Sequence, residues 1–283
     1  MEEWFTAYKI PFGAWMKVII DTIQLHGRGS IDIIRNSLKF LIEGLSQLLL
    51  IPPPLVIIIL FAAFAWWLHR SISLTAFVAL ALLFILDQGY WGATMETLAL
   101  VASATAVSVV IGVPLGIVAA HRPMVFSVLR PILDIMQTLP TFVYLVPTLV
   151  LFGLGVVPGL ISTVIFAIPA PIRMTRLGIA SVPTPLIEAG EAFCATKRQL
   201  LWKVELPYAI PTIMAGINQC IMLSLSMVVI AALVGAGGLG KPVVRALNTV
   251  NIAMGFEAGF AIVLLAIVID RIAKARDAKG SGQ

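Results

Sequence analysis

The chain has 283 residues, of which 60% are hydrophobic and 12% are charged, and its mean hydropathy is +1.02. One soluble core cannot hold so many apolar side chains, so the composition predicts an integral membrane protein and excludes a soluble domain. The formal net charge of +5 does not indicate nucleic-acid binding, because the cytoplasmic loops of membrane proteins are enriched in Lys and Arg.

The N-terminal segment, residues 1–50, mixes charged and apolar positions instead of forming an uncharged run. Its first 43 residues contain five basic and five acidic side chains. This pattern predicts an extramembrane or interfacial helical segment and not a span. Glu2 and Glu3 stand where a cleavable signal peptide would have a basic start, so no signal peptide is expected.

Seven later segments are apolar enough to cross a membrane. A helix needs about 20 residues to cross roughly 30 Å of hydrocarbon. The uncharged run 135–172 would form a helix about 57 Å long, so it must fold back, and "GLGVVPGL" (153–160) contains turn-forming residues. The sequence therefore predicts an all-α polytopic membrane protein of about seven transmembrane helices, at 54–68, 71–86, 94–119, 131–152, 156–174, 209–234 and 252–269.

The basic residues predict how these helices are oriented. The loops 121–130 and 173–203 and the tail from residue 271 are rich in Lys and Arg, and two predicted helices separate each region from the next. All three regions therefore lie on one side, which the positive-inside rule makes the cytoplasm, and the N-terminus lies outside. Lys241 and Arg245 oppose this orientation, because it places them outside with no acid nearby.

A charged island, "LIEAGEAFCATKRQLLWKVELPYAIP" (186–211), separates two of the apolar runs. It contains strong helix formers and lies in a predicted cytoplasmic loop of about 35 residues. Loops with a helix of their own are more often functional than simple connectors. An interfacial helix resting on lipid headgroups is the alternative reading.

The pattern "EAG…C…V-E-LP" within this island resembles the EAA loop of permease subunits of bacterial ATP-binding-cassette importers. Three longer stretches, beginning "LDIMQTLP", "PTPLIEAG" and "AIVLLAIV", occur in the right order and resemble the glycine betaine/proline importer permeases, a branch that includes choline permeases. The family pattern has a glycine where this chain has Cys194, so the backbone there loses some of its freedom at positive φ.

The resemblance implies the ABC importer permease fold, with a cytoplasmic EAA coupling loop at 186–207 that lies across an ATPase subunit. It implies a permease core at 91–272, two accessory helices at 51–90 and a cytoplasmic tail at 273–283, in the bacterial inner membrane. The implied partners are a second permease copy, two ATPase subunits, an extracytoplasmic substrate-binding protein and the lipid bilayer. The residues expected to form the coupling loop are Glu188, Ala189, Gly190, Cys194, Lys197, Arg198, Leu206 and Pro207.

No nucleotide-binding motif or metal-ligand spacing is found in the chain. "GAGGLG" (235–240) is followed by Lys-Pro where a phosphate-binding loop has Lys-Ser or Lys-Thr, and no soluble strand precedes it. The three histidines and two cysteines are scattered. We therefore expect that this chain is not an enzyme and binds no cofactor, with ATP used by the partner subunit. The glycine cluster is either a tight turn at the membrane surface or a site where a docked binding protein approaches the backbone closely.

The stretch "MQTLPTFVYLVP" (136–147) has two prolines in an apolar run, so its helix must kink and leave carbonyls free, which is tolerable along a cavity. The candidate pathway-lining residues are Gln137, Thr138, Phe142 and Tyr144. The aromatic rings of Phe142 and Tyr144 could attract a quaternary ammonium. Simple packing is the alternative.

Three acidic residues, Glu96, Asp134 and Glu257, lie in or near the predicted spans. Buried carboxylates are costly in a membrane and are candidates for function, although structural or interfacial roles also fit.

The leading hypothesis is an importer permease for glycine betaine, proline or a related quaternary amine such as choline. An autonomous ion-coupled secondary transporter for the same solutes is the alternative. Such carriers tend to be larger and to contain internal repeats, and no repeat is found in this chain. A membrane enzyme would need a catalytic cluster, which the scattered histidines do not supply.

Overall fold

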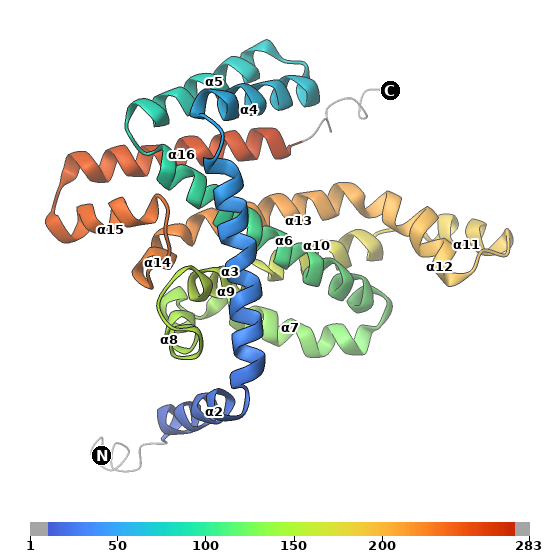
Figure 1. Ribbon diagram of the computed structural model, residues 1–283. Coiled ribbons are helices and arrows are strands. Elements are labelled where there is room, and N and C mark those ends of the chain that lie inside the picture. The colour runs from blue at the N-terminus through green and yellow to red at the C-terminus, as the bar shows by residue number, and fades with distance from the viewer. Residues whose placement is uncertain (1–10, 275–283) are drawn as a thin grey trace, which may run out of the picture.

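The computed structural model describes residues 11–274, and all regular structure in that range is helical, as the sequence predicts (Figure 1). The elements in chain order are α2 (Phe12–His26), α3 (Arg28–Leu50), α4 (Pro54–His69), α5 (Ile72–Asp87), α6 (Trp91–His121), α7 (Pro123–Thr138), α8 (Thr141–Phe152), α9 (Val156–Ala167), α10 (Pro169–Ala180), α11 (Thr184–Ala192), α12 (Lys197–Leu200), the π-helical turn η1 (Leu201–Glu205), α13 (Leu206–Ser226), α14 (Val228–Leu233), α15 (Gly240–Thr249) and α16 (Ile252–Ala273).

Four helical stretches in the described part of the chain are long and apolar enough to cross a membrane as they stand. They are α6, the α9–α10 pair (Val156–Ala180), the α12–α14 run (Lys197–Leu233) and α16. Each of them overlaps one predicted span, at 94–119, 156–174, 209–234 and 252–269. Length and hydropathy therefore located four of the seven predicted spans as long apolar helices.

The other predicted spans differ in form. The predicted span 54–68 corresponds to α4, which is bent by 99° against α3, and the predicted span 131–152 covers parts of α7 and α8, which are bent by 98°. Counting each bent pair as one span raises the total within residues 11–274 to six, and the predicted span 71–86 corresponds to α5, a shorter apolar helix. Prolines cause both breaks, because proline has no N–H to donate and disfavours helical geometry in the preceding residue.

The centre of the molecule is formed by α6, α10 and α13, which run side by side (Figure 1). Glycines allow these helices to touch. A Cβ at Gly116 of α6 would lie 2.6 Å from the Cβ of Thr175, and one at Gly216 of α13 would lie 2.6 Å from the Cβ of Met174. Thr175 and Met174 are consecutive on α10, so α10 contacts a glycine on each neighbour. Small residues at such contacts are typical of helix packing in membranes.

The α4–α5 hairpin and helix α3 lie beside this centre. The α4–α5 hairpin packs against α16 through a buried apolar cluster that includes Val78, Ile85 and Leu265 (Figure 1). Helix α3 crosses the bundle instead of running along it, and it contacts α6, α8 and α9.

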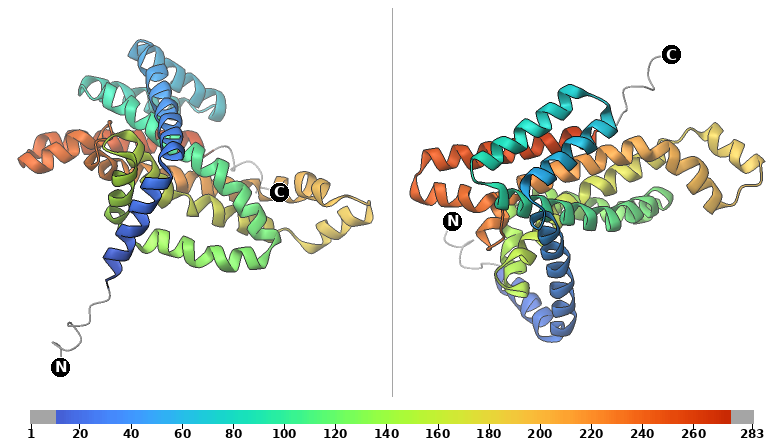
Figure 2. Two further views of the ribbon diagram at one scale, coloured as in Figure 1. Left: turned by 60° about the horizontal axis from the view of Figure 1, so that its bottom comes forward. Right: turned by 45° about the horizontal axis from the view of Figure 1, so that its top comes forward.

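The two ends of the bundle are built differently. The α11–α12 segment projects from one end, whereas α8, α14 and the α14–α15 turn lie toward the other (Figures 1 and 2). The first of these features coincides with the charged island, and the second contains the glycine cluster.

Candidate functional site

The charged island forms a projecting helical hairpin made of α11, α12 and η1. Glu188, Lys197 and Arg198 are all exposed on it. Two large apolar side chains are exposed as well, since Phe193 is 89% and Trp202 63% accessible. A surface that combines charges with uncovered aromatic rings is the kind that binds a partner or a membrane surface.

The turn between α11 and α12 explains the role of position 194. The N–H of Cys194 bonds to the carbonyl of Glu191 at 2.8 Å, and the N–H of Ala195 bonds to the carbonyl of Gly190 at 3.1 Å. This pair of bonds is the Schellman motif, which needs a left-handed residue after the helix, usually glycine. Cys194 takes that conformation, with φ at 58°. The motif therefore requires a positive φ at position 194, and Cys194, a non-glycine residue, adopts that conformation under strain.

Two further contacts set the shape of the hairpin. Thr196 and Gln199 form a capping box that starts α12, because the Gln199 amide accepts the Thr196 N–H at 2.8 Å and the Thr196 hydroxyl accepts the Gln199 N–H. Gly190 lies against Leu200, and a Cβ at Gly190 would lie 2.6 Å from the Leu200 Cδ1 atom. Because Gly190 has no side chain, α11 can pack closely against α12 there. Ala189, the residue before it, is exposed.

The base of the hairpin is joined to the centre of the molecule by a pair that the sequence did not reveal. Glu205 is buried, and its Oε2 lies 2.8 Å from the Nε2 of His121, which is the last residue of α6. Leu206 and Pro207 follow directly and begin α13. Because residues 121 and 205 are far apart in the chain, only the packing of α6 against the start of α13 brings them together.

The candidate pathway residues do not form one surface. Tyr144 is buried and its hydroxyl donates to the carbonyls of Met136 and Ile135, whereas Phe142 is 57% exposed. The helical donor for the Met136 carbonyl would be the N–H of residue 140, which is a proline. Tyr144 therefore supplies the hydrogen bond that Pro140 cannot make, and it stabilises the sharp break between α7 and α8.

Gln137 and Thr138 bond within the same region. The Gln137 Oε1 accepts from Arg173 Nη1 at 2.8 Å, and Arg173 Nη2 donates to Asp134 Oδ1 at 2.6 Å, which joins α10 to α7. The Thr138 hydroxyl donates to the Asp134 carbonyl at 3.0 Å. Asp134 is thus one side of an ion pair between helices.

The glycine cluster packs against α6 of the same chain. The N–H of Gly238 donates to Glu96 Oε2 at 2.6 Å, and the N–H of Leu239 donates to Thr97 Oγ1 at 2.8 Å. A Cβ at Gly237 would overlap the Glu96 carboxylate. The cluster is therefore a tight turn whose glycines allow close approach to α6, and approach by a docked binding protein stays a prediction. The third acid, Glu257 on α16, accepts from the Tyr90 hydroxyl at 3.3 Å.

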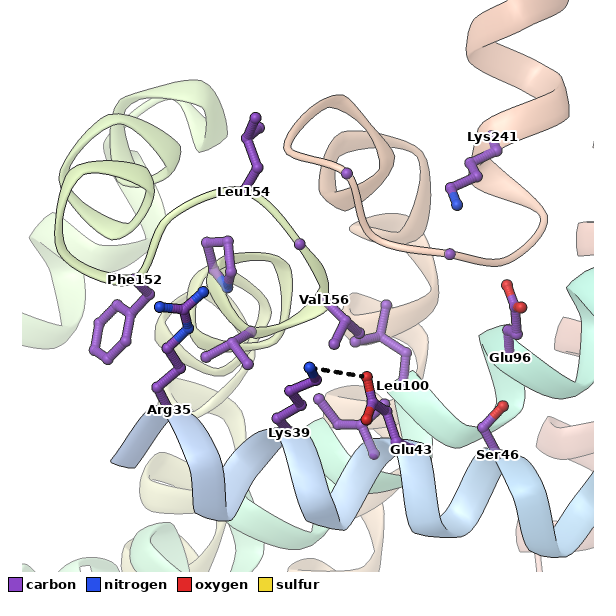
Figure 3. A pocket seen from close by; sticks show the side chains of 16 residues that line it. Arg35, Lys39, Glu43, Ser46, Glu96, Leu100, Phe152, Leu154, Val156 and Lys241 are labelled. Carbon is purple, nitrogen blue, oxygen red and sulfur yellow. Dashed lines mark ion pairs between the residues drawn. The ribbon is translucent and has the colours of Figure 1, made fainter. Parts of the chain in front are cut away.

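A pocket of about 380 Å³ opens beside this turn, between α3, the start of α6 and the α8–α9 turn (Figure 3). Its wall carries three cations and two carboxylates. They are Arg35, Lys39, Lys241, Glu43 and Glu96. Sequence reasoning singled out Glu96 and the glycine cluster separately, but not the three residues from α3. The signal that could have found them is a set of charges one helical turn apart at 35, 39 and 43.

Comparison with known proteins defines the class of molecule to which these features belong. Residues 112–279 match the family described as "binding-protein-dependent transport system inner membrane component". The chain belongs to this family. It is therefore an integral inner-membrane permease component, and the projecting hairpin and the pocket are features of such a permease.

Two relatives show how far the similarity extends. The permease is 48% identical over 265 residues to the glycine betaine transport system permease protein OpuAB of Bacillus subtilis, covering 93% of each chain. It is 45% identical over 275 residues to the glycine betaine/proline betaine transport system permease protein ProW of Escherichia coli, covering 96% of this chain and 77% of ProW. These matches extend the similarity well beyond the region matched by the family.

A solved structure has a similar helical arrangement over about two thirds of the chain. The permease superposes on a chain of the MetNI methionine ABC transporter, in an inward-facing conformation, with a TM-score of 0.58 and 27% identity, covering 68% of this chain and 96% of that chain. The ABC importer permease fold predicted from the sequence is confirmed.

Proposed function

We propose that this chain is the permease subunit of an ATP-driven importer for glycine betaine, or for a closely related solute such as proline betaine, proline or choline. The observation that carries the proposal is 42–48% identity, over nearly the whole chain, to three proteins named as glycine betaine permeases. A choline permease of Bacillus subtilis is more distant, at 35% identity over half of this chain.

The energy for transport is proposed to come from separate subunits. The chain contains no G-x-x-x-x-G-K-[ST] motif, so ATP would be bound and used by two ATPase subunits. The α11–α12 hairpin supports this arrangement, because it exposes Glu188, Lys197 and Arg198 and two aromatic rings that nothing in residues 11–274 covers. Two copies of the permease and an extracytoplasmic binding protein complete the proposed assembly.

We propose the following arrangement in the membrane. The hairpin, the α6–α7 turn and the C-terminus face the cytoplasm, and the glycine turn and α15 face outward. Residues 11–50 form an interfacial segment, which the 99° angle between α3 and α4 supports, and the first ten residues of the predicted 1–50 segment lie outside the described part of the chain. Residues 51–90 form the accessory hairpin. The core covers 91–272. The tail 273–283 lies, apart from its first two residues, outside the described part of the chain.

Reconstitution tests the proposed function. The permease alone in vesicles is expected to accumulate no glycine betaine. The permease with its ATPase and binding protein is expected to accumulate it when the ATPase faces the vesicle lumen and ATP is supplied there. Uptake driven by a proton or sodium gradient without those partners would establish a secondary transporter instead.

Cysteine labelling tests the orientation. In a background lacking Cys194 and Cys220, a single cysteine at Lys197 or Lys274 is expected to be shielded from a membrane-impermeant thiol reagent in intact cells, and one at Asn248 is expected to react. The reverse pattern would overturn the orientation and remove the proposed ATPase contact.

A further inference from the structure

The charged pocket lies at the end of the bundle opposite the α11–α12 hairpin, where the glycine turn and the α8–α9 turn meet (Figures 1 and 3). Its wall is formed by α3, α6, the end of α8, the start of α9, the glycine turn and the start of α15. Helix α3 supplies Arg35, Lys39 and Glu43, α6 supplies Glu96, and the start of α15 supplies Lys241. In the proposed orientation this pocket opens toward the outside, where a binding protein would release its solute.

Most of the charges in the pocket are not used by the fold. Lys39 and Glu43 form an exposed pair at 3.8 Å, which is weak. Within residues 11–274, Arg35, Lys241 and Glu96 have no ion-pair partner closer than 4.0 Å. Glu96 holds the glycine turn through one oxygen, Oε2, and its Oε1 makes no hydrogen bond within the same residues. Charges of both signs therefore remain available around a single hollow.

These charges are separated across the pocket. In Figure 3 the Arg35 guanidinium lies on one side beside Phe152, and the Glu96 carboxylate and the Lys241 ammonium lie on the opposite side. Lys39 and Glu43 lie between them. Leu100 and Val156 provide apolar surface between the two sides. The wall thus offers a cation at the Arg35 end, charges of both signs from Lys39 to the Glu96 end, and an apolar floor.

We propose that this pocket is a receiving site for a small zwitterion that carries a carboxylate and a quaternary ammonium; the proposal rests on the proposed function and adds a solute site within the permease itself. A guanidinium presents forked donors that fit a carboxylate. A quaternary ammonium cannot donate a hydrogen bond, so it is held by nearby carboxylates and by apolar or aromatic surface. The volume of about 380 Å³ lies in the range of roughly 300–1,000 Å³ that is usual for small-molecule sites.

The arrangement fits a zwitterion better than a simple ion. A simple anion would use Arg35 but would lie close to Glu43 and Glu96, and a simple cation would meet Arg35, Lys39 and Lys241. Like charges brought together in this way oppose binding. A zwitterion can place each of its charges against the opposite one.

The test measures glycine betaine binding by the assembled permease–ATPase complex in lipid nanodiscs, without the binding protein, by saturation-transfer NMR and equilibrium dialysis. The wild-type complex is expected to bind betaine saturably, and to bind acetate and tetramethylammonium at least tenfold more weakly. Arg35→Gln and Glu96→Gln are each expected to weaken betaine binding at least tenfold. Glu96→Gln keeps an oxygen that can accept the Gly238 N–H, so the glycine turn is preserved.

Arg245→Gln is the matched control, because Arg245 is an exposed cation at the same end of the molecule that does not line the pocket. It is expected to leave binding unchanged. If Arg35→Gln does not assemble, Arg35→Lys is the second variant. It keeps the positive charge but not the two parallel N–H donors of the guanidinium, and it is expected to bind betaine severalfold more weakly than the wild type.

Three results would overturn the site: no saturable binding to the wild-type complex, equal losses in Arg35→Gln and Arg245→Gln, or loss of binding-protein docking with betaine binding intact. The last result would identify a surface for the binding protein. The proposed function is tested separately by ATP-driven betaine uptake with all partners present. If uptake occurs and the pocket variants bind and transport normally, the site fails and the function stands.

Discussion

The α6–α10–α13 centre and the α11–α12 hairpin use their residues in opposite ways. In the centre, glycines are pressed against neighbouring helices, and Gly116 and Gly216 leave no room for even one methyl group. In the hairpin, nearly every side chain from Glu188 to Arg198 is exposed. Residues of the centre therefore serve the fold of this chain, whereas the exposed residues of the hairpin are available to another molecule.

A substitution in the centre should have the largest effect. Gly116→Leu would place its Cβ 2.7 Å from the Ile172 carbonyl oxygen, which is backbone and cannot turn aside, so α6 and α10 must separate. Overpacking alone costs about 1–3 kcal/mol, and moving backbone adds to it. We expect loss of folded permease from membranes, measured by size-exclusion chromatography and protease resistance. Gly92→Leu on the same helix has open space around it and should fold normally.

Charge reversal on the hairpin should remove coupling and leave the fold intact. The double variant Lys197→Glu with Arg198→Glu would repel an acidic partner surface. The binding free energy would fall by several kcal/mol if the contact excludes water, and by little if the contact stays exposed to solvent. We expect normal membrane levels with loss of ATPase co-purification or of solute-stimulated hydrolysis. Lys274→Glu, outside the hairpin, is the control.

Normal uptake by the Lys197 and Arg198 double variant would remove these two residues from the contact. Normal uptake after the replacement of residues 188–203 by a Gly/Ser linker would refute the coupling role of the whole hairpin.

The join between the two regions should show an intermediate effect. Glu205→Ala removes the bond to His121 that connects the base of the hairpin to α6. The loss of such a hydrogen bond costs about 1–2 kcal/mol, because His121 is partly exposed and water can replace its partner. We expect a lower thermal midpoint and less ATP hydrolysis per solute-loaded binding protein. Glu205→Gln keeps an acceptor and should recover most of both, whereas equal losses in the two variants would mean that the negative charge itself matters.

The smallest expected effect is a gain in local stability. Cys194→Gly relieves a left-handed conformation that costs roughly 1–2 kcal/mol, offset by about 0.5–1 kcal/mol of extra flexibility in the unfolded chain. Amide hydrogen exchange across residues 184–205 should slow by a factor of a few. Cys194→Ala keeps the strained backbone and should show no such slowing. Slower exchange in Cys194→Ala as well would mean that the thiol, and not the backbone, is responsible.

The membrane class, the all-α fold and four of the seven predicted spans follow from the sequence, because a helix needs a long apolar stretch to cross a bilayer. The island was also located from the sequence, since its charges contrast with the apolar runs on both sides. The resemblance predicts a coupling role for its residues, which stays a prediction, and the pattern "EAG…C" includes Cys194, where the structure has a turn.

Proline shows where local sequence information stops. The "TLPTF" stretch predicts a disturbance of the helix, but its extent, a 98° bend, depends on Tyr144 supplying a hydrogen bond across the break and on Arg173 joining α7 to α10. Both contacts need the tertiary arrangement, so a single span at 131–152 was a reasonable but incomplete description.

Only the tertiary structure decided which distant residues meet. His121 meets Glu205, Glu96 meets the glycine turn, and Arg35 faces the same pocket as Lys241. Hydropathy and local patterns report how one segment behaves toward lipid or water, over a few helical turns. Such contacts depend on how close two helices can approach, and that distance is set jointly by the glycines on one helix and the side chains on the other.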